Sequence, residues 1–214
     1  MNEFLIEETK DYVRDALKDE SNGHDYFHAL RVFNNANNIA QDYKCDLLVV
    51  RLAALLHDVD DYKILGGVVG QFTNAQKFLL EKQLPSEIID QVCDIINKIS
   101  FKGDEKLDLL TLEGKIVQDA DRLDAIGVMG IVRVFAFAGY YNEKIYDPSK
   151  IIDSSITAEK YKKHDLTTIE HFYVKLLKLK DLMNTKKGKE IAEDRHHYMV
   201  EFLNRFYTEW EGKN

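Results

Sequence analysis

The chain has 214 residues, enough for one large domain or two small ones with a substantial buried core. Its 37 acidic and 29 basic residues leave a formal charge of −8, which argues against general binding to nucleic acid or to an anionic membrane. The N-terminal segment lacks the basic and apolar regions of a signal peptide, and no apolar run approaches the roughly 20 residues of a membrane-spanning helix. We therefore expect a cytoplasmic protein with no membrane span.

Apolar residues recur at helical rather than strand-like spacing in the longer segments of the chain. The pattern predicts helices over residues 25–43, 46–59, 71–82, 86–99, 111–139, 157–184 and 187–210. Polar loops are expected around Gly103 and over 142–155, and the sequence does not say whether the second loop is a lid. Since no internal repeat or low-complexity linker interrupts it, the chain is predicted to be a single all-α domain over 1–214. Its core motifs would occupy 20–140, with C-terminal helices in 157–211 packing on them.

Two glycines fall inside the predicted helix 111–139. Gly127 and Gly130 stand three residues apart, and each costs about 1 kcal/mol relative to alanine in a helix interior. Close packing of the backbone at this pair is the expected compensation.

The first candidate functional residues, His57 and Asp58, end the apolar run LLVVRLAALL. Burying an imidazole beside a carboxylate costs several kcal/mol unless both groups find partners. A divalent metal ion would satisfy both. The alternative is an ordinary histidine at the C-terminus of a helix, with Asp58 beginning the next turn.

A second candidate, His28, lies at the edge of the apolar stripe of the predicted helix 25–43. Asp25 and Arg31 stand three residues to either side of it and share its surface. This arrangement is typical of a ligand histidine oriented by a carboxylate, and it is equally typical of an exposed row of ion pairs.

The third feature is the segment QDADRLDA, which places three aspartates in an otherwise apolar helix. Asp119, Asp121 and Asp124 are costly there unless a cation or an arginine compensates them. Arg122 can pair with one or two of them, and the spacing alone does not choose a metal ligand.

Taken together, the order H…HD…D, with the last aspartate in an ADRL context, resembles the HD-domain superfamily of metal-dependent phosphohydrolases. The segments HDYFHALRV, LAALLHDVDDYK, EGKIVQDADRLDAIG and HFYVKLLKLKDLMNT are similar to the bacterial single-domain group of these proteins, over residues 20–210. The resemblance implies four metal ligands, namely His28, His57, Asp58 and Asp121, the last because it occupies the ADRL position. One departure is Val174, where many relatives are expected to carry glutamate after HFY.

Two imidazoles and two carboxylates would leave about two positions open on a six-coordinate ion. Such a set suits Mn, Mg, Fe, Co or Ni better than Zn, whose closed structural sites favour four ligands and cysteine. No histidine stands between Asp58 and Asp121, where binuclear members of the superfamily add them. One divalent metal ion is therefore expected.

A phosphate substrate also requires cationic or amide partners. The candidates are Arg31, Lys63, Lys115, Gln118, His171 and Lys175. In the predicted helix 157–184, His171 and Lys175 share a face with Lys178, although a solvated basic face would show the same spacing. The segment HFY-x-K-L-L belongs to the family pattern, which favours a role for the first two.

General acid–base help could come from His24 or Asp61, which stand near the implied ligands in the sequence. The alternative is that these two side chains orient His28 or His57.

The leading hypothesis is a metal-dependent phosphohydrolase that uses metal-activated water to cleave a phosphoester or phosphoanhydride of a small metabolite. A nucleotide is the expected substrate on the resemblance alone. The alternative is a metal-stabilised module that binds and senses a nucleotide without turnover. Neither nucleic acid nor a membrane is expected as a partner, and the sequence leaves a homodimer open.

Overall fold

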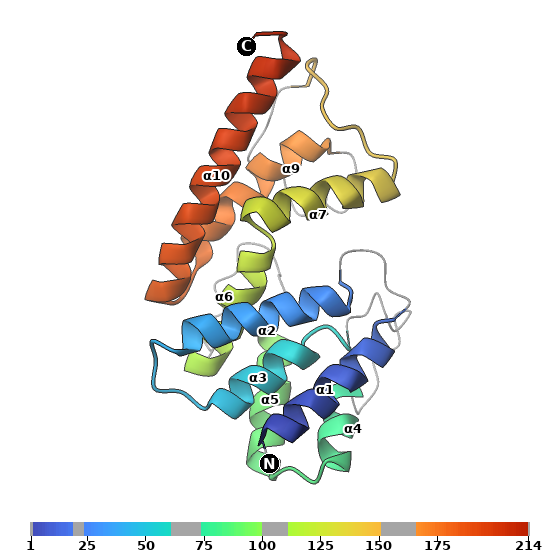
Figure 1. The fold of residues 1–214 in the computed structure, drawn as a ribbon, viewed down its shortest axis with the longest axis vertical. Helices are drawn as coiled ribbons and strands as arrows, with labels where there is room; N and C mark the ends of the chain where they lie inside the picture. The colour runs from blue at the N-terminus through green and yellow to red at the C-terminus, as the bar shows by residue number, and fades with distance from the viewer. Residues whose placement is uncertain (1, 19–23, 61–73, 100–110, 151–165, 214) are drawn as a thin grey trace. The chain divides into compact units, whose positions relative to one another are not determined.

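The computed structural model describes residues 2–18, 24–60, 74–99, 111–150 and 166–213 (Figure 1). Within these ranges the chain forms α-helices and one 3-10 helix, and no strand. The predicted all-α fold class is therefore confirmed. The chain divides into two compact units, Met1–Asp121 and Arg122–Asn214. A single domain over 1–214 stays a prediction.

The first unit is built around a central apolar helix. It contains α1 (Asn2–Ala16), α2 (Tyr26–Ala40), α3 (Leu47–Leu56), α4 (Asn74–Glu81), α5 (Ser86–Ile99) and most of α6 (Leu112–Asp124). The α3 helix packs against α1, α2 and α5, and seven of its ten residues are buried. Because α3 has neighbours on several sides, its sequence is apolar almost all round.

Four of the predicted helices correspond to helices of this unit. The segments 25–43, 46–59, 71–82 and 86–99 contain α2, α3, α4 and α5, although residues 71–73 lie outside the described ranges. Two aspartates set the helix starts. The Asp25 side chain caps α2, and the Asp46 Oδ1 accepts from the backbone N–H of Leu48 at 2.9 Å and of Val49 at 3.2 Å.

The α1 helix was not among the predicted elements. Its buried residues are Ile6, Thr9 and Val13, at the spacing i, i+3 and i+7. This is a helical pattern, but one of its three positions is a threonine, whose hydroxyl is satisfied by donating to the Leu5 carbonyl at 2.8 Å.

The second unit contains the end of α6, α7 (Gly127–Tyr140), α9 (Thr168–Val174), the 3-10 helix η1 (Leu176–Leu182) and α10 (Lys186–Trp210). The long α10 helix matches the predicted range 187–210 to within one residue, and it packs against α7 and η1. Aromatic rings fill the space between the helices. Phe202 of α10 lies 5.9 Å from the ring centroids of both Phe135 and Phe172.

The prediction of one helix over 111–139 is wrong, because the chain breaks between α6 and α7. Ile126 is extended, with φ −128° and ψ 169°, and Gly127 has φ +72°, a conformation that side chains with a Cβ rarely adopt. The expected close backbone approach is present at Gly130, where a Cβ would lie 2.3 Å from the Ala125 carbonyl oxygen. The glycines thus make a tight corner rather than a continuous helix.

The prediction of one α-helix over 157–184 is also wrong. Residues 157–165 lie outside the described ranges, and the remainder forms the short α9 and then η1. The apolar residues of this segment that recur at a spacing of three or four are nevertheless all buried, namely Ile169, Phe172, Leu176, Leu179 and Met183. A 3-10 helix has three residues per turn, so a spacing of three and four residues fits a kinked α/3-10 segment as well as a straight α-helix. Residues 142–150 form the turns expected of a loop, and 151–155 are not described.

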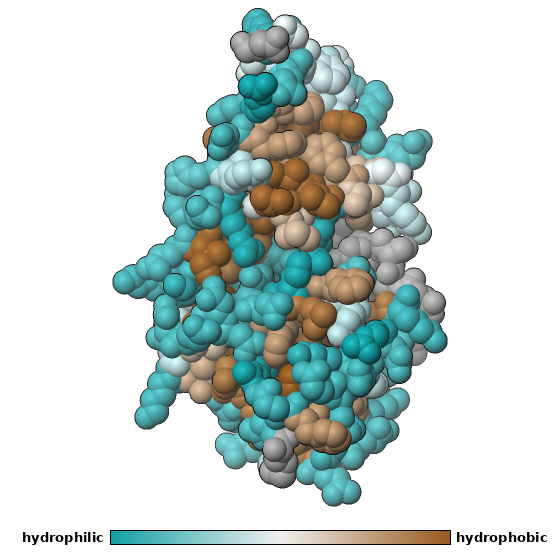
Figure 2. Space-filling model, in the orientation of Figure 1, coloured by the Kyte–Doolittle hydropathy of each residue, from teal (hydrophilic) through white to brown (hydrophobic). Residues whose placement is uncertain are grey.

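Apolar side chains also gather at the surface over α7 (Figure 2). Val128, Val132 and Tyr140 are exposed along one side of this helix. No single helix in the described part of the chain is both long and apolar enough to cross a membrane, although α6 and α7 counted together across their break would pass on length and composition.

Candidate metal centre

Three helix ends in the first unit carry the four implied ligands. His28 lies in the first turn of α2, where its backbone N–H donates to Asp25 Oδ1 at 2.8 Å. His57 is the C-terminal cap of α3, and Asp58 follows it directly. Asp121 lies in the last turn of α6.

The four side chains converge, with His28 in contact with the other three. The His28 Nε2 lies 3.2 Å from His57 Nε2, 3.3 Å from Asp58 Oδ2 and 3.5 Å from Asp121 Oδ1. The His57 Nε2 lies 3.4 Å from Asp58 Oδ2 and 3.9 Å from Asp121 Oδ1. Both histidine side chains are nearly inaccessible, whereas about a third of the Asp121 side chain is exposed. The group is therefore buried on one side and open at Asp121.

Backbone contacts fix which nitrogen His57 presents to the group. Its Nδ1 lies 2.9 Å from the carbonyl oxygen of Ala54, one turn earlier in α3. A carbonyl can only accept, so Nδ1 carries a proton, and Nε2 is the nitrogen through which His57 could bind a cation. This Nε2 lies 3.2 Å from the Nε2 of His28, so the two histidines direct these nitrogens at one place, where a cation could bind.

The neighbouring histidines stabilise the ionised form of Asp58. Burial acts to raise its pKa, but the charge of His57 and hydrogen bonds from His24 and His28 outweigh burial and hold the pKa well below the usual value. Asp58 is consequently a carboxylate at neutral pH, although only 8% of the residue is exposed. An ionised, buried carboxylate surrounded by imidazoles is typical of a metal-binding site.

The donor set fits a divalent metal ion. Metal bonds to nitrogen and oxygen are about 2.1 Å long, so neighbouring ligand atoms on a six-coordinate ion lie about 3 Å apart. The separations of 3.2 to 3.5 Å from His28 Nε2 are close to that value. His28, His57 and Asp121 each offer one atom to a group whose members all lie within 4.8 Å of one another, and His24, His28 and Asp58 form a second such group.

His24, a candidate acid–base residue, lies at the edge of this cluster. Its Nδ1 is 2.8 Å from Asp58 Oδ2, and its side chain is about one third exposed. His24 thus contacts Asp58, and its ring also lies edge-on to that of His28, with the centroids 5.4 Å apart. The other candidate, Asp61, lies outside the described residues.

The two remaining aspartates of QDADRLDA are buried more deeply than Asp121. Asp119 is fully buried, and Asp124 is 1% exposed. Asp124 pairs with Arg133 of α7, whose Nη1 lies 2.6 Å from Asp124 Oδ2. Arg122 donates to the carbonyl of Leu182. A neighbouring arginine therefore compensates Asp124, whereas the partners of Asp121 are histidines.

The phosphate candidates of the first unit lie on the helices that carry the ligands. Arg31 is half-buried one turn after His28, and Gln118 is buried one turn before Asp121. Lys115 is exposed at the start of α6, and no ion pair joins it to another described residue. Lys63 lies outside the described residues.

The other two phosphate candidates, His171 and Lys175, belong to the second unit. His171 lies on α9, and Lys175 is its C-terminal cap. The predicted helical face shared with Lys178 does not exist, because η1 begins directly after Lys175. Burial and the neighbouring charge of Lys175 lower the pKa of His171 to about 3, so at neutral pH it offers a neutral hydrogen-bonding group rather than a cation.

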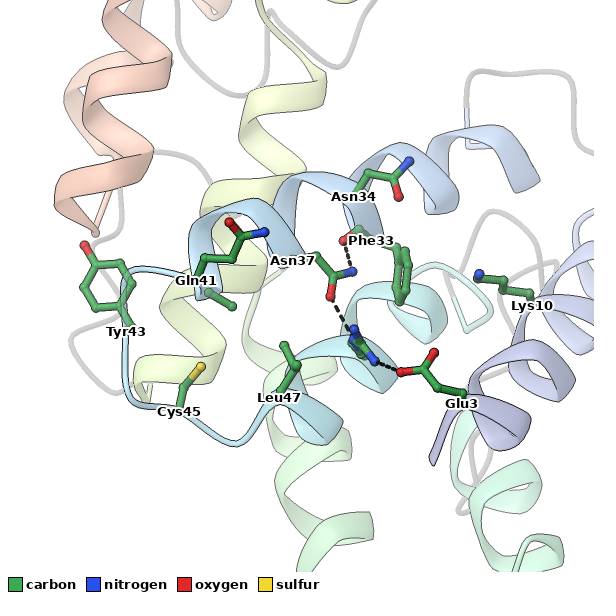
Figure 3. Close-up of a pocket in the computed structure, with 11 residues that line it drawn as sticks. Glu3, Lys10, Phe33, Asn34, Asn37, Gln41, Tyr43, Cys45 and Leu47 are labelled. Carbon is green, nitrogen blue, oxygen red and sulfur yellow. Dashed lines mark hydrogen bonds and ion pairs between the residues drawn. The ribbon is translucent and has the colours of Figure 1, made fainter. Parts of the chain in front are cut away.

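A pocket of about 560 Å³ lies elsewhere in the first unit, among residues of α1, α2 and α3 (Figure 3). Arg51 joins the three helices there, donating to Asn37 Oδ1 at 2.8 Å and to Glu3 Oε1 at 2.6 Å. None of the four candidate ligands lines it. The pocket is therefore distinct from the cluster.

Known proteins share both the sequence pattern and the fold. The HD domain family matches residues 25–126, a range that contains His28, His57, Asp58 and Asp121. The uncharacterized protein YpgQ of Bacillus subtilis is 38% identical over 96% of this chain and 94% of its own length. A crystal structure of YpgQ in complex with ADP has a TM-score of 0.78 at 33% identity, covering 98% of this chain and 97% of the other. An HD-superfamily hydrolase from Bacillus thuringiensis has a TM-score of 0.76 at 34% identity over the full length of both chains.

The fold and the site together define a class of protein, namely all-α proteins with a histidine–aspartate cluster at three helix ends. The chain belongs to the HD-domain superfamily, as the resemblance of its motifs implied.

Proposed function

We propose that this protein is a metal-dependent phosphohydrolase that cleaves a phosphoester or phosphoanhydride bond of a small metabolite, with nucleotides as the leading substrate class. The observation that carries the proposal is the convergence of four side chains: the Nε2 atoms of His28 and His57 lie 3.2 Å apart, and each lies 3.3 to 3.9 Å from a carboxylate oxygen of Asp58 and of Asp121. The ADP complex of B. subtilis YpgQ supports a nucleotide as the ligand.

In this proposal the four converging side chains hold one divalent ion, which could be Mn, Mg, Fe, Co or Ni. Such an ion, when bound, lowers the pKa of a coordinated water and neutralises charge on a phosphate. The protein itself keeps the candidate ligands in the orientation and the ionisation state that metal binding requires. Ala54 keeps the lone pair of His57 Nε2 directed at the site, and the surrounding imidazoles keep Asp58 ionised.

His24 is the proposed acid–base group, because it combines contact with Asp58 and partial exposure to solvent. From this edge a protonated imidazole can donate to a leaving oxygen, and a neutral one can receive a proton from water. Asp61 is a second proposed acid–base group, because it stands close to Asp58 in the sequence.

Phosphate oxygens are proposed to bind Arg31 and Gln118, which stand on the same helices as the ligands, with Lys63, Lys115, His171 and Lys175 as further candidates. Exposed Lys115 makes no ion pair with the described residues, so its charge is available to a substrate. Lys115→Ala should raise KM and leave the metal content unchanged; an unchanged KM would remove Lys115 from this set.

The experiment is a hydrolysis assay on metal-stripped protein reloaded with Mg, Mn, Co or Ni. Phosphate and pyrophosphate release from a panel of nucleotides is measured for the wild type and for Asp58→Ala. Turnover that requires metal and disappears in Asp58→Ala supports the proposal. Full activity in Asp58→Ala contradicts it.

The second candidate function is a metal-stabilised module that binds a nucleotide without turnover. It is favoured by one observation, that the YpgQ structure holds ADP. Metal-dependent nucleotide binding with no release of phosphate or pyrophosphate across the panel would select this alternative.

A further inference from the structure

The α2 helix contains the run NNANN, in which four of five residues are poor helix formers. The four asparagines are not equivalent. Asn34 and Asn38 are exposed, whereas Asn37 bonds within the first unit to Phe33 and Arg51. Asn35 is the one whose side chain reaches α6, where its Nδ2 donates to the carbonyl oxygen of Ala120 at 3.2 Å.

The acceptor of this hydrogen bond immediately precedes a candidate ligand. Ala120 is followed by Asp121, whose Oδ1 lies 3.5 Å from His28 Nε2. His28 and Asn35 are seven residues apart on α2, which places them on one face of the helix and about 10 Å apart along its axis. Two side chains of one helix thus converge on consecutive residues of another.

This pair of contacts constrains how α6 can rotate and slide against α2. The carbonyl of Ala120 points along the axis of α6 and also belongs to its backbone hydrogen-bonding ladder, so a side-chain bond to it fixes the position of the helix itself. A slip of α6 by one residue would turn the Asp121 side chain by about 100° around the helix axis. A second hydrogen bond holds the N-terminal end of α6, where Glu113 Oε1 accepts from the backbone N–H of Asp46 at 3.0 Å.

We propose that Asn35 is a positioning residue that holds Asp121 in place for metal binding through its hydrogen bond to the Ala120 carbonyl. The inference rests on the proposed function, in which Asp121 is a ligand. Asn35 itself contacts neither the ion nor the substrate. The sequence signal for this residue is the NNANN run of α2.

The test is a Mn²⁺ titration of metal-free full-length protein, with the free ion followed by electron paramagnetic resonance. Asn35→Leu removes the donor and keeps a similar volume. Asn38→Leu makes the same change at an exposed position of the same helix that has no hydrogen bond to another described residue. The expected result is a Kd for Mn²⁺ raised about 10- to 100-fold in Asn35→Leu and unchanged within about twofold in Asn38→Leu.

Two further variants separate positioning from folding. Asn35→Gln restores an amide donor and should recover part of the affinity, and Asn35→Ser serves in the same titration if the leucine variant does not fold. The visible absorption of the Co²⁺-loaded protein should also change in Asn35→Leu, because it reports ligand geometry rather than stability.

Tight binding by the wild type with an unchanged Kd in Asn35→Leu would overturn this inference and leave the proposed metal site intact. Asp121→Ala is titrated in parallel. If it binds Mn²⁺ as tightly as the wild type, Asp121 is not a ligand, and both the proposed site and the role of Asn35 fail.

Discussion

Two buried aspartates in this protein are stabilised in different ways. Asp124, in the second unit, is 1% exposed and pairs with Arg133 at 2.6 Å. Asp58, in the first unit, is 8% exposed, and its ion pairs with described residues all go to histidines, namely His24, His28 and His57.

The difference lies in the charge of the partners. Arginine is always protonated, so the positive charge of Arg133 neutralises the carboxylate of Asp124. This ion pair needs no metal ion. An imidazole nitrogen can give up its proton and coordinate a cation instead, so three imidazoles around a carboxylate form a candidate site for a metal ion. Aspartates with similar burial can thus be sorted by their neighbours into structural ones and candidate metal ligands.

The largest effect is expected from Asp58→Ala. Metal content should fall from one ion per chain to none, and turnover should drop by at least about 100-fold, because the remaining ligands lose a carboxylate. Helical content by circular dichroism should hold, since Asp58 lies beyond the end of α3.

The matched control for that variant is Asp60→Ala. Asp60 accepts from the first backbone N–H groups of α4, at 2.5 Å from Asn74 and 2.9 Å from Ala75. Its loss should cost about 1 kcal/mol of stability and leave the metal content unchanged. Equal metal content in both variants would contradict the division drawn between the two kinds of aspartate.

The opposite pattern is expected of Arg133→Met. Removing the partner of a buried carboxylate should lower the free energy of unfolding by about 3 kcal/mol, and metal content should stay at the wild-type level. Urea unfolding and metal analysis measure the two quantities on one sample. Adding Asp124→Leu should recover most of the lost stability, and a loss of metal without a loss of stability would contradict the structural role of this pair.

A smaller, pH-dependent effect is expected at His171, whose pKa burial and the Lys175 charge lower to about 3. Its unfolded pKa is about 6.5, so between these values the unfolded chain binds the proton more readily. Stability contributed by the neutral ring is therefore present above pH 6.5 and lost as the pH falls below it.

His171→Gln should flatten this acid response, by about 1 kcal/mol between pH 7.5 and 5.5 in urea unfolding. The exposed His197 supplies the control, and His197→Gln should keep the wild-type slope. Identical slopes in all three proteins would show that His171 is not protected from protonation.

The smallest expected effect is the difference in stability between Gly127→Ala and Gly212→Ala. Both glycines have positive φ, +72° and +68°, so alanine costs about 1 kcal/mol of backbone strain at each. Only at Gly127 would the new Cβ meet a side chain, lying 2.9 Å from Cγ of Arg195, which donates to the Leu123 carbonyl at the end of α6. Thermal unfolding should show the larger loss for Gly127→Ala; equal losses would remove Arg195 from the corner between α6 and α7.

The sequence predicted the fold class and most helices of the first unit because burial there depends on simple periodicity. His57 and Asp58 could be singled out because they end a helix that is otherwise apolar, where a polar pair is conspicuous. Only the resemblance to HD proteins selected Asp121 from its two neighbours. The structure supplies the physical distinction, since Asp124 pairs with Arg133 and Asp121 lies beside His28.

Other features could not be predicted because they depend on contacts between segments distant in sequence. The bond of Asn35 to Ala120 spans 85 residues, and the pairing of His24 with Asp58 spans 34. The break at Ile126 and the 3-10 segment after Lys175 were missed for another reason. In both segments the buried residues recur every three or four positions. This spacing does not distinguish a continuous α-helix from a bent helix or a 3-10 helix.

The central claim is that His28, His57, Asp58 and Asp121 hold a divalent metal ion, and anomalous diffraction tests it most directly. Crystals soaked in Mn²⁺ are measured at the manganese absorption edge. The account predicts an anomalous peak about 2.0 to 2.4 Å from the Nε2 atoms of both histidines and from an oxygen of each aspartate. A map without a peak among these four side chains, or with its main peak elsewhere in the protein, would contradict it.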